Sequence, residues 1–312
     1  MEPLPIVRVA NIRPATSTDR WLIQGLWAWP AVGFIGGMPK ASKTWLALEL
    51  AVAVASGRPC LGRFPVHKRG PVLLVAAEDS PADIRQRVQA IAKARGVDLD
   101  TLPVGLVTET GLMLDQPDWQ RRLRITLAKT KPRLLVLDPM VRLHQGDENS
   151  SSDISELLGF LRGVQRDHQV AICLVHHIRK AGASQPGQAL RGSGDLHAWI
   201  DSGLYMIKRK DGLHLHIEHR ANPSPDPIRL KLEQDPPRLE VIGELEQQQE
   251  PTQEALDHRV LQALRDRPSN RTDLRETLKI RNETLGLALR RLEGVGAVCL
   301  QGNRWAVPVP AP

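Results

Sequence analysis

The 312-residue sequence has little cysteine and no long hydrophobic run. Its three cysteines, Cys60, Cys173 and Cys299, lie far apart and form no C-x-x-C pair. This spacing argues against a disulfide scaffold or a zinc framework and fits a reducing, cytoplasmic compartment. No apolar run reaches the roughly 18 residues that a membrane span needs. Proline, arginine and asparagine interrupt residues 1–20, so we expect no signal peptide, no membrane helix and no membrane partner.

The overall composition is that of an ordinary globular protein. Hydrophobic residues make up 41% of the chain and charged residues 25%, so neither disorder nor a fibrous structure is indicated. The length is sufficient for one large domain and a smaller one. The net charge of +7 is compatible with an acidic polymer as partner, but basic charge also favours solubility and does not identify a partner by itself.

Apolar runs and helical stretches alternate between Trp21 and about Lys180. The runs that predict strands cover residues 31–37, 71–79, 133–139 and 170–177. The stretches that predict helices cover residues 43–57, 80–96 and 152–168. Strands joined by crossover helices are typical of an α/β fold with a parallel sheet.

The pattern changes after Ser202. Alternating apolar and polar residues flank the dipeptide at residues 211–212, Asp-Gly, which suits a tight hairpin, and further strand-like runs follow. We therefore expect an antiparallel extension of the sheet. Residues 245–252 show no apolar periodicity and contain Pro251, which predicts a linker.

The remaining residues predict a second, smaller domain. Three helical stretches with suitable capping residues are followed by two strand-like runs. Helix, helix, helix and hairpin is the order of a winged helix-turn-helix domain. The expected organisation is an N-terminal arm at residues 1–20, an α/β domain at 21–244, a linker at 245–252 and a winged helix-turn-helix domain at 253–312.

Residues 36–45, GGMPKASKTW, differ at one position from the phosphate-loop pattern G-x-x-x-x-G-K-[ST]. In such a loop, backbone N–H groups at a helix N-terminus hold the β-phosphate, a lysine offsets charge and a hydroxyl holds magnesium. Lys43 and Thr44 are in place, whereas Ser42 replaces the last glycine. Serine is small and suits a helix N-terminus, so we expect it to be accommodated without strain. The predicted nucleotide-binding residues are Gly37, Met38, Pro39, Lys40, Ala41, Ser42, Lys43, Thr44 and Trp45. A glycine- and proline-rich turn that binds nothing is the alternative.

Two other predicted strands end in acidic residues. Asp138 follows one apolar run, and Glu78 and Asp79 follow another. Ligands of open α/β sheets lie at the carboxyl ends of the strands, so we expect these side chains and Lys43 at one edge. A single acid after a strand is more often a loop residue, but the combination predicts a nucleoside-triphosphate hydrolase that uses Mg²⁺. Thr44 and Asp138 would hold Mg²⁺ and Glu78 would polarise the attacking water, with Asp79 the weaker candidate.

These motifs resemble the RecA-type core of hexameric helicases, and most closely the RepA-type plasmid replicative helicases in the AAA_25 group of P-loop ATPases. The similar segments cover residues 36–51, 73–80, 134–162, 173–182 and 189–209. The resemblance implies a RecA-like ATPase domain that assembles as a homo-hexamer. It also implies ATP hydrolysis at subunit interfaces and translocation on single-stranded DNA.

The resemblance further implies roles for residues near the strand ends. The glutamate that activates water falls on Glu78, and the γ-phosphate sensor falls on His177, beside His176. Histidines at a strand end also commonly satisfy local backbone groups, which is the alternative for this pair. A cation for the neighbouring subunit's site is expected on the next strand. Arg209 is preferred over its two lysine neighbours because a guanidinium can bridge phosphate oxygens, although all three could serve solubility alone.

The segment that follows the sensor strand is expected to be a loop that faces a central channel. The residues expected to contact single-stranded DNA there are Arg179, Lys180 and Arg191. Incidental charges on a surface loop are the alternative. The sequence departs from the family at Asp201, where some members have an arginine finger, so the identity of the interface cation stays open.

Arginines are also grouped on the second and third helical stretches of the small domain. The third helix of a winged helix commonly enters the major groove of DNA, with arginines on phosphates and base edges. The candidates for duplex DNA binding are Arg281, Arg290 and Arg291. Docking of a partner protein is the alternative.

Three functions fit these features. The first is an ATP-dependent DNA motor, a RepA-like replicative helicase. The second is an ATP-switched DNA-binding regulator or loader of a mobile element, without unwinding activity. The third is a protein-interaction scaffold with a decayed ATP site, which the intact Lys43, Thr44, Glu78 and Asp138 argue against.

Overall fold

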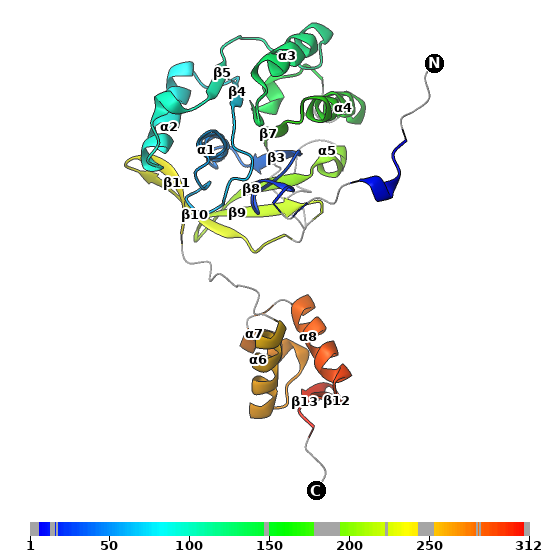
Figure 1. Cartoon of the computed structure of the whole chain (residues 1–312). Helices are drawn as coiled ribbons and strands as arrows, with labels where there is room; N and C mark the ends of the chain where they lie inside the picture. The colour runs from blue at the N-terminus through cyan, green and yellow to red at the C-terminus, as the bar shows by residue number, and fades with distance from the viewer. Residues whose placement is uncertain are drawn as a thin grey trace. The chain divides into compact units, whose positions relative to one another are not determined.

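The computed structural model describes residues 6–12, 16, 18–146, 150–177, 194–221, 224–242, 253–278, 280 and 282–308. The chain divides into two compact units, Met1–Gly243 and Glu244–Pro312 (Figure 1). Within the described residues, no helix is both long enough and apolar enough to cross a membrane.

The larger unit is built on a nine-stranded sheet. In spatial order its strands are β11 (Pro237–Val241), β10 (Ile228–Gln234), β9 (Gly212–His219), β8 (Ser202–Arg209), β3 (Val32–Gly37), β7 (Ala171–His177), β6 (Leu134–Asp138), β4 (Val72–Ala76) and β5 (Val104–Val107). The strands from β8 to β5 are parallel, and β9, β10 and β11 extend the sheet in antiparallel order. The predicted α/β fold, a parallel sheet with an antiparallel extension, is therefore confirmed.

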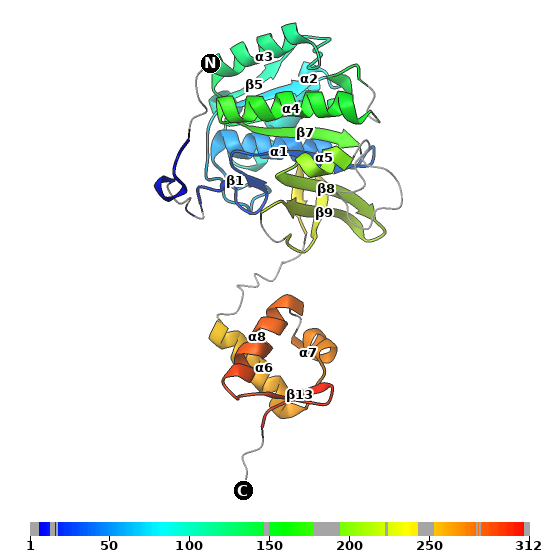
Figure 2. The same ribbon diagram turned by 90° about the vertical axis from the view of Figure 1, so that its right-hand side faces the viewer.

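Helices cover both faces of this sheet (Figure 1). They are α1 (Lys43–Ser56), α2 (Pro81–Ala94), α3 (Pro117–Thr130), α4 (Ser151–His168) and the short α5 (Gly194–Trp199). On one face, α3, α4 and α5 share an apolar core with the strands, and Figure 2 shows α4 lying along β7. Helix α1 is buried on almost all sides, as expected for a helix without a polar face.

Shorter elements complete the larger unit. Strands β1 (Trp21–Ile23) and β2 (Trp27–Ala28) form a separate hairpin, and 3-10 turns cover η1 (Val9–Asn11), η2 (Leu99–Thr101) and η3 (Met140–Arg142). The glycines of β3 let β8 approach closely. A Cβ at Gly33 would overlap the Ser202 carbonyl, and one at Gly37 would lie 2.9 Å from the Met206 carbonyl oxygen. The first glycine of the phosphate-loop pattern thus also serves strand packing.

The smaller unit has its own apolar core. Its elements are α6 (Gln253–Asp266), α7 (Arg271–Leu278), α8 (Asn282–Gly294), β12 (Cys299–Gln301) and β13 (Arg304–Ala306). Leucines and valines from all three helices and the segment before β12 form the core. Strands β12 and β13 pair as an antiparallel hairpin. The elements follow the predicted order of three helices and a hairpin.

A buried ion pair ties α1 to the end of α2 and to the sheet extension. The Glu49 side chain in α1 is 1% exposed, and Arg95 Nη2 lies 3.0 Å from each of its carboxylate oxygens. Glu49 also accepts from the Leu239 N–H of β11 at 3.3 Å. Burial raises the pKa of Glu49 to about 6, while Arg95 acts in the opposite direction. The carboxylate is therefore tolerated at neutral pH only because it is paired.

We expect Arg95→Ala to lower the free energy of unfolding by about 3 kcal/mol at pH 8, because Glu49 is left as an unpaired buried charge. The loss should be smaller at pH 5. The pKa of Glu49 is higher in the folded protein than in the unfolded chain, so the folded state binds this proton more tightly. The stability gained from the proton is fully present below about pH 4.5 and is lost as the pH rises through about 6. Urea unfolding at both pH values measures this difference. The matched Arg95→Ala/Glu49→Gln protein should show no such pH effect, and an equal loss at both pH values would contradict the role given to the pair.

Candidate nucleotide-binding site

A cavity of about 440 Å³ lies at the carboxyl ends of the parallel strands. The predicted site residues that line it are Pro39, Lys40, Ala41, Ser42, Lys43, Thr44, Trp45, Glu78, Asp79, Asp138 and His177. The structure thus brings together the side chains that the sequence placed at the ends of four different strands. Of the predicted loop residues, Gly37 packs against β8 and Met38 against the apolar core instead.

The loop has an unusual backbone. Ser42 has φ 60° and ψ 28°, in the left-handed region, and Lys40 has φ 62°. Ser42 precedes the first residue of α1, but its side chain makes no capping hydrogen bond. The expectation that serine fits this position without strain is therefore wrong, because a residue with a Cβ is disfavoured at positive φ. Glycine is common at this position of such loops because it lacks that penalty.

Lys43 is the charged centre of the cavity. Its side chain is 8% exposed, and its ammonium donates to the Met38 carbonyl oxygen at 3.1 Å and to His177 Nδ1 at 3.2 Å. Burial lowers the pKa of Lys43, and the charges of Asp138 and Glu78 oppose this shift. Because an ammonium group only donates, Nδ1 of His177 acts as the acceptor and the neutral imidazole carries its proton on Nε2.

Thr44 and Asp138 form a pair suited to Mg²⁺. The Thr44 hydroxyl donates to the Asp138 carboxylate. Burial raises the pKa of Asp138 to about 6, while the hydrogen bond from Thr44 opposes this shift. Among the described residues, no group of three or more His, Cys, Asp or Glu side chains could hold a metal ion alone. Mg²⁺ commonly binds through one or two protein oxygens together with substrate phosphates and water, and the pair fits that mode.

The two neighbouring acids after β4 have different partners. Asp79 receives two hydrogen bonds from Arg87, at 2.7 and 3.1 Å, which occupy both of its oxygens. Among the contacts of the described residues, Glu78 is held at one oxygen only, by Arg142 Nε at 2.9 Å. Glu78 is therefore better placed than Asp79 to act on a water molecule. Sequence reasoning missed both arginines, because they lie on other elements and no motif marks them.

Arg87 also lies over the ring of Trp45, 5.8 Å from its centroid. Both residues line the cavity. Arg87 and Trp45 thus form one wall of the cavity. The Asp79 carboxylate and the Trp45 ring together hold the Arg87 guanidinium in position.

Other predicted site residues lie away from this cavity. Arg209 is the last residue of β8. The strand pairs with β3 as far as Met206, which lies opposite Gly37, so Arg209 lies beyond the end of that pairing. Its guanidinium lies 3.3 Å from the ring nitrogen of His216. His176, beside His177, is buried, and its ring lies against Phe34. The predicted DNA-contacting residues Arg179, Lys180, Arg191 and Arg281 are outside the described residues.

Two arginines of the small unit differ in their environment. Arg290 is exposed on α8. Arg291 instead pairs with Asp257 of α6, with hydrogen bonds of 2.7 and 3.3 Å. Its charge is thus already engaged within the unit.

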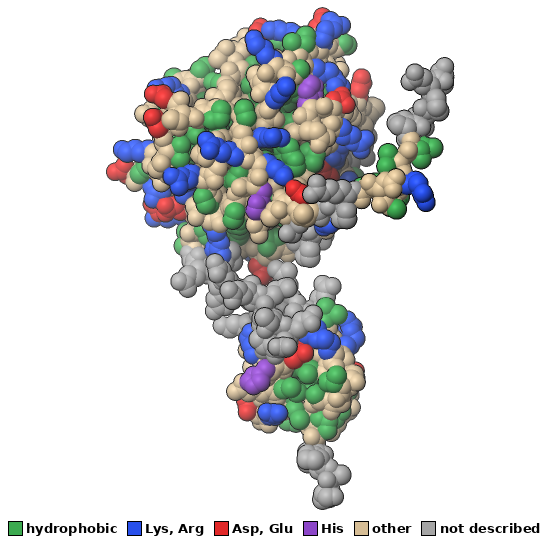
Figure 3. Space-filling view, viewed as in Figure 1, with side chains coloured by type: hydrophobic (Ala, Val, Ile, Leu, Met, Phe, Trp, Pro, Cys, Tyr) green, Lys and Arg blue, Asp and Glu red, His purple; other side chains and the backbone are tan. Residues whose placement is uncertain are grey.

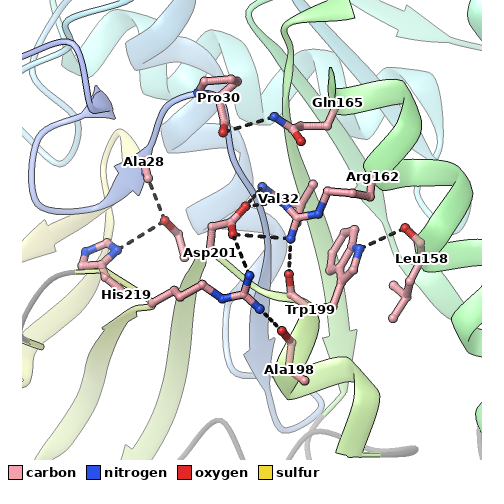
Figure 4. Close-up of polar contacts among 12 residues, drawn as sticks. Ala28, Pro30, Val32, Leu158, Arg162, Gln165, Ala198, Trp199, Asp201 and His219 are labelled. Carbon is pink, nitrogen blue, oxygen red and sulfur yellow. Dashed lines mark hydrogen bonds and ion pairs between the residues drawn. The ribbon is translucent and has the colours of Figure 1, made fainter. Parts of the chain in front are cut away.

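Asp201, the position at which the sequence departs from the resemblance to RepA-type helicases, has a structural role (Figure 4). Its carboxylate accepts from the Val32 N–H at 3.1 Å and from the Arg162 guanidinium at 2.5 Å, and it pairs with Arg220 at 3.7 Å. Arg162 also donates to the Trp199 carbonyl oxygen. An aspartate at this position therefore joins α4, the end of α5 and the start of β3.

The fold and the cavity define a P-loop protein built to bind a nucleoside triphosphate. Residues 2–183 match the family model AAA_25, described as an AAA domain, and the chain belongs to this family of P-loop ATPases. A crystal structure of the RadB recombinase is also similar. The two sequences are 19% identical, the TM-score is 0.49, and the match covers 69% of this chain and 92% of that chain.

We expect Ser42→Gly to raise the free energy of unfolding of the larger unit by about 0.5 to 1 kcal/mol, because relief at positive φ exceeds the added entropy of unfolded glycine. Ser80→Gly is the matched control. Ser80 has φ −69° and its hydroxyl caps α2 by accepting from the Asp83 N–H, so that change should lower the same quantity by a few tenths of a kcal/mol. Urea unfolding measures both, and a loss of stability in Ser42→Gly would count against strain in the loop.

Proposed function

We propose that the chain is an ATP-dependent DNA motor, a RepA-like helicase that hydrolyses ATP at subunit interfaces while it translocates on single-stranded DNA. One observation carries the ATPase part of the proposal. Lys43, Thr44, Glu78, Asp138 and His177, which come from four strand ends, all line one cavity. A buried lysine and two carboxylates around a helix N-terminus are typical of a site that binds phosphate.

The proposed hydrolysis depends on positioning and charge. The loop N–H groups and Lys43 would hold the β- and γ-phosphates, and Thr44 and Asp138 would hold Mg²⁺, which supplies further charge compensation. Glu78 would orient the attacking water through its second oxygen. His177 would report the γ-phosphate, because Lys43 must exchange its contact with Nδ1 for a phosphate oxygen when ATP binds.

The DNA part of the proposal follows from the resemblance to RepA-type helicases and needs a ring of subunits. Figure 3 shows lysines and arginines spread over the visible face of the larger unit, among acidic and apolar side chains. The net charge therefore does not mark a DNA surface on that face. In the proposal single-stranded DNA runs through the central channel of a homo-hexamer, and the smaller unit is a winged helix that contacts duplex DNA through Arg290.

An ATP-switched DNA-binding regulator or loader of a mobile element, without unwinding activity, is the second candidate. In this candidate the smaller unit supplies DNA targeting. The engagement of Arg291 by Asp257 removes one candidate DNA contact on α8 and therefore bears on both candidates equally. In this alternative ATP controls assembly, and no strand separation takes place.

ATP turnover with and without single-stranded DNA tests the motor. We expect DNA to stimulate the wild type, Lys43→Ala to lose Mg-ATP binding, and Glu78→Gln to bind Mg-ATP while turnover falls about 10²-fold or more. Asp79→Asn is the matched control and should be affected much less, because Arg87 occupies that carboxylate. Phosphate release and strand separation of a forked substrate are the measurements. ATPase activity without unwinding would favour the regulator, and wild-type protein that binds no Mg-ATP would exclude both.

Arg209 is proposed to complete the neighbouring subunit's site. We expect Arg209→Ala and Lys43→Ala to be inactive alone, because each removes one half of every interface. Mixed oligomers of the two should regain turnover, since some interfaces then combine an intact Lys43 with an intact Arg209. Phosphate release after subunit exchange measures this. Mixtures that stay as inactive as the separate proteins, under conditions where exchange is demonstrated, would rule out Arg209 as the interface cation.

A further inference from the structure

The Glu78 carboxylate is held by the same segment that supplies Asp138. Arg142 Nε donates to Glu78 Oε1 at 2.9 Å. Arg142 ends η3, the 3-10 turn that follows Asp138 and Pro139. Its side chain lines a second cavity of about 280 Å³, next to the nucleotide cavity, rather than the nucleotide cavity itself. The guanidinium therefore reaches Glu78 from outside the space where phosphates would lie.

Backbone hydrogen bonds fix the two segments that carry this pair. The Ala77 N–H donates to the Asp138 carbonyl oxygen at 2.8 Å, at the point where β4 and β6 end side by side. The Arg142 N–H donates to the Pro139 carbonyl oxygen at 3.2 Å and closes the turn. Glu78 and Arg142 thus extend from backbone segments that are hydrogen-bonded to one another, which brings the two side chains within reach.

We propose that Arg142 is a positioning residue for ATP hydrolysis, which holds one oxygen of Glu78 and leaves the other directed to the attacking water. This inference depends on the proposed function. The contrast with Asp79 supports it, because Arg87 occupies both oxygens of that carboxylate. The Arg142 and Glu78 side chains are 63% and 49% exposed, and exposed ion pairs add little to stability. The contact is therefore better explained by the orientation of Glu78 than by folding.

Steady-state ATP turnover of Arg142→Ala tests the assignment. We expect kcat to fall about tenfold with KM for ATP within about twofold, because a misplaced general base slows the chemical step without changing phosphate binding. Arg142→Lys should restore part of the rate. In a Glu78→Gln background, Arg142→Ala should change the residual rate less than about twofold, since the group that it positions is gone. A purely structural contribution would slow both backgrounds equally.

Arg122→Ala is the matched control. Arg122 pairs with Glu109 at 2.8 Å with similar exposure, and Glu109 lines the same second cavity, but this pair does not contact Glu78. We expect its kcat to stay at the wild-type value. Circular dichroism checks that each variant is folded.

The outcomes separate this inference from the proposed function. Wild-type turnover that depends on Glu78 but is unchanged or faster in Arg142→Ala would overturn the positioning role alone. Equal losses in Arg142→Ala and Arg122→Ala, or additive losses with Glu78→Gln, would overturn it as well. A wild-type protein without ATP turnover would overturn the proposed function and this assignment with it.

Discussion

The burial of the Lys43 ammonium is the constraint on which the site depends. A buried charge is tolerated only where partners surround it. Here the partners are the Met38 carbonyl oxygen, the unprotonated nitrogen of His177, and the charges of Asp138 and Glu78. These groups come from the loop and from three further strand ends. They meet only if the strands are parallel and end at one edge of the sheet. The parallel sheet is therefore what allows the Lys43 charge to be buried at this site.

A second buried charge on the same helix extends this constraint through the larger unit. Glu49 joins α1 to Arg95 at the end of α2 and to Leu239 of β11. Because α2 begins directly after the segment that carries Glu78, its contacts with α1 link the two halves of the site. Arg87 of α2 lies over the Trp45 ring of α1, and Arg95 pairs with Glu49 further along the same helix. Small displacements of Lys43 relative to Glu78 are therefore resisted by the core, which favours a site that is already assembled before a nucleotide binds.

The sequence predicted the parts whose signal is local. The buried strands β3, β4, β6 and β7 appeared as apolar runs, and α2 was marked by its Ser80 cap and Pro81. Strand β5 and helix α3 were missed because their signals are weak: β5 is short and only half-buried, and α3 buries only two leucines. The site carboxylates were predictable because they follow strands directly. Their arginine partners were not, since each pairing joins residues from different elements and depends on the folded geometry.

The left-handed backbone at Ser42 and Lys40 is a property that residue identity does not reveal. Both residues carry a Cβ at positive φ, a conformation that costs on the order of 1 kcal/mol or more for each residue. The packed β3 before the loop and the buried α1 after it hold this conformation. Within the loop, the Ala41 N–H donates to the Met38 carbonyl oxygen at 3.2 Å, so the chain also closes on itself there. A serine in place of glycine at this position then lowers the stability of the protein.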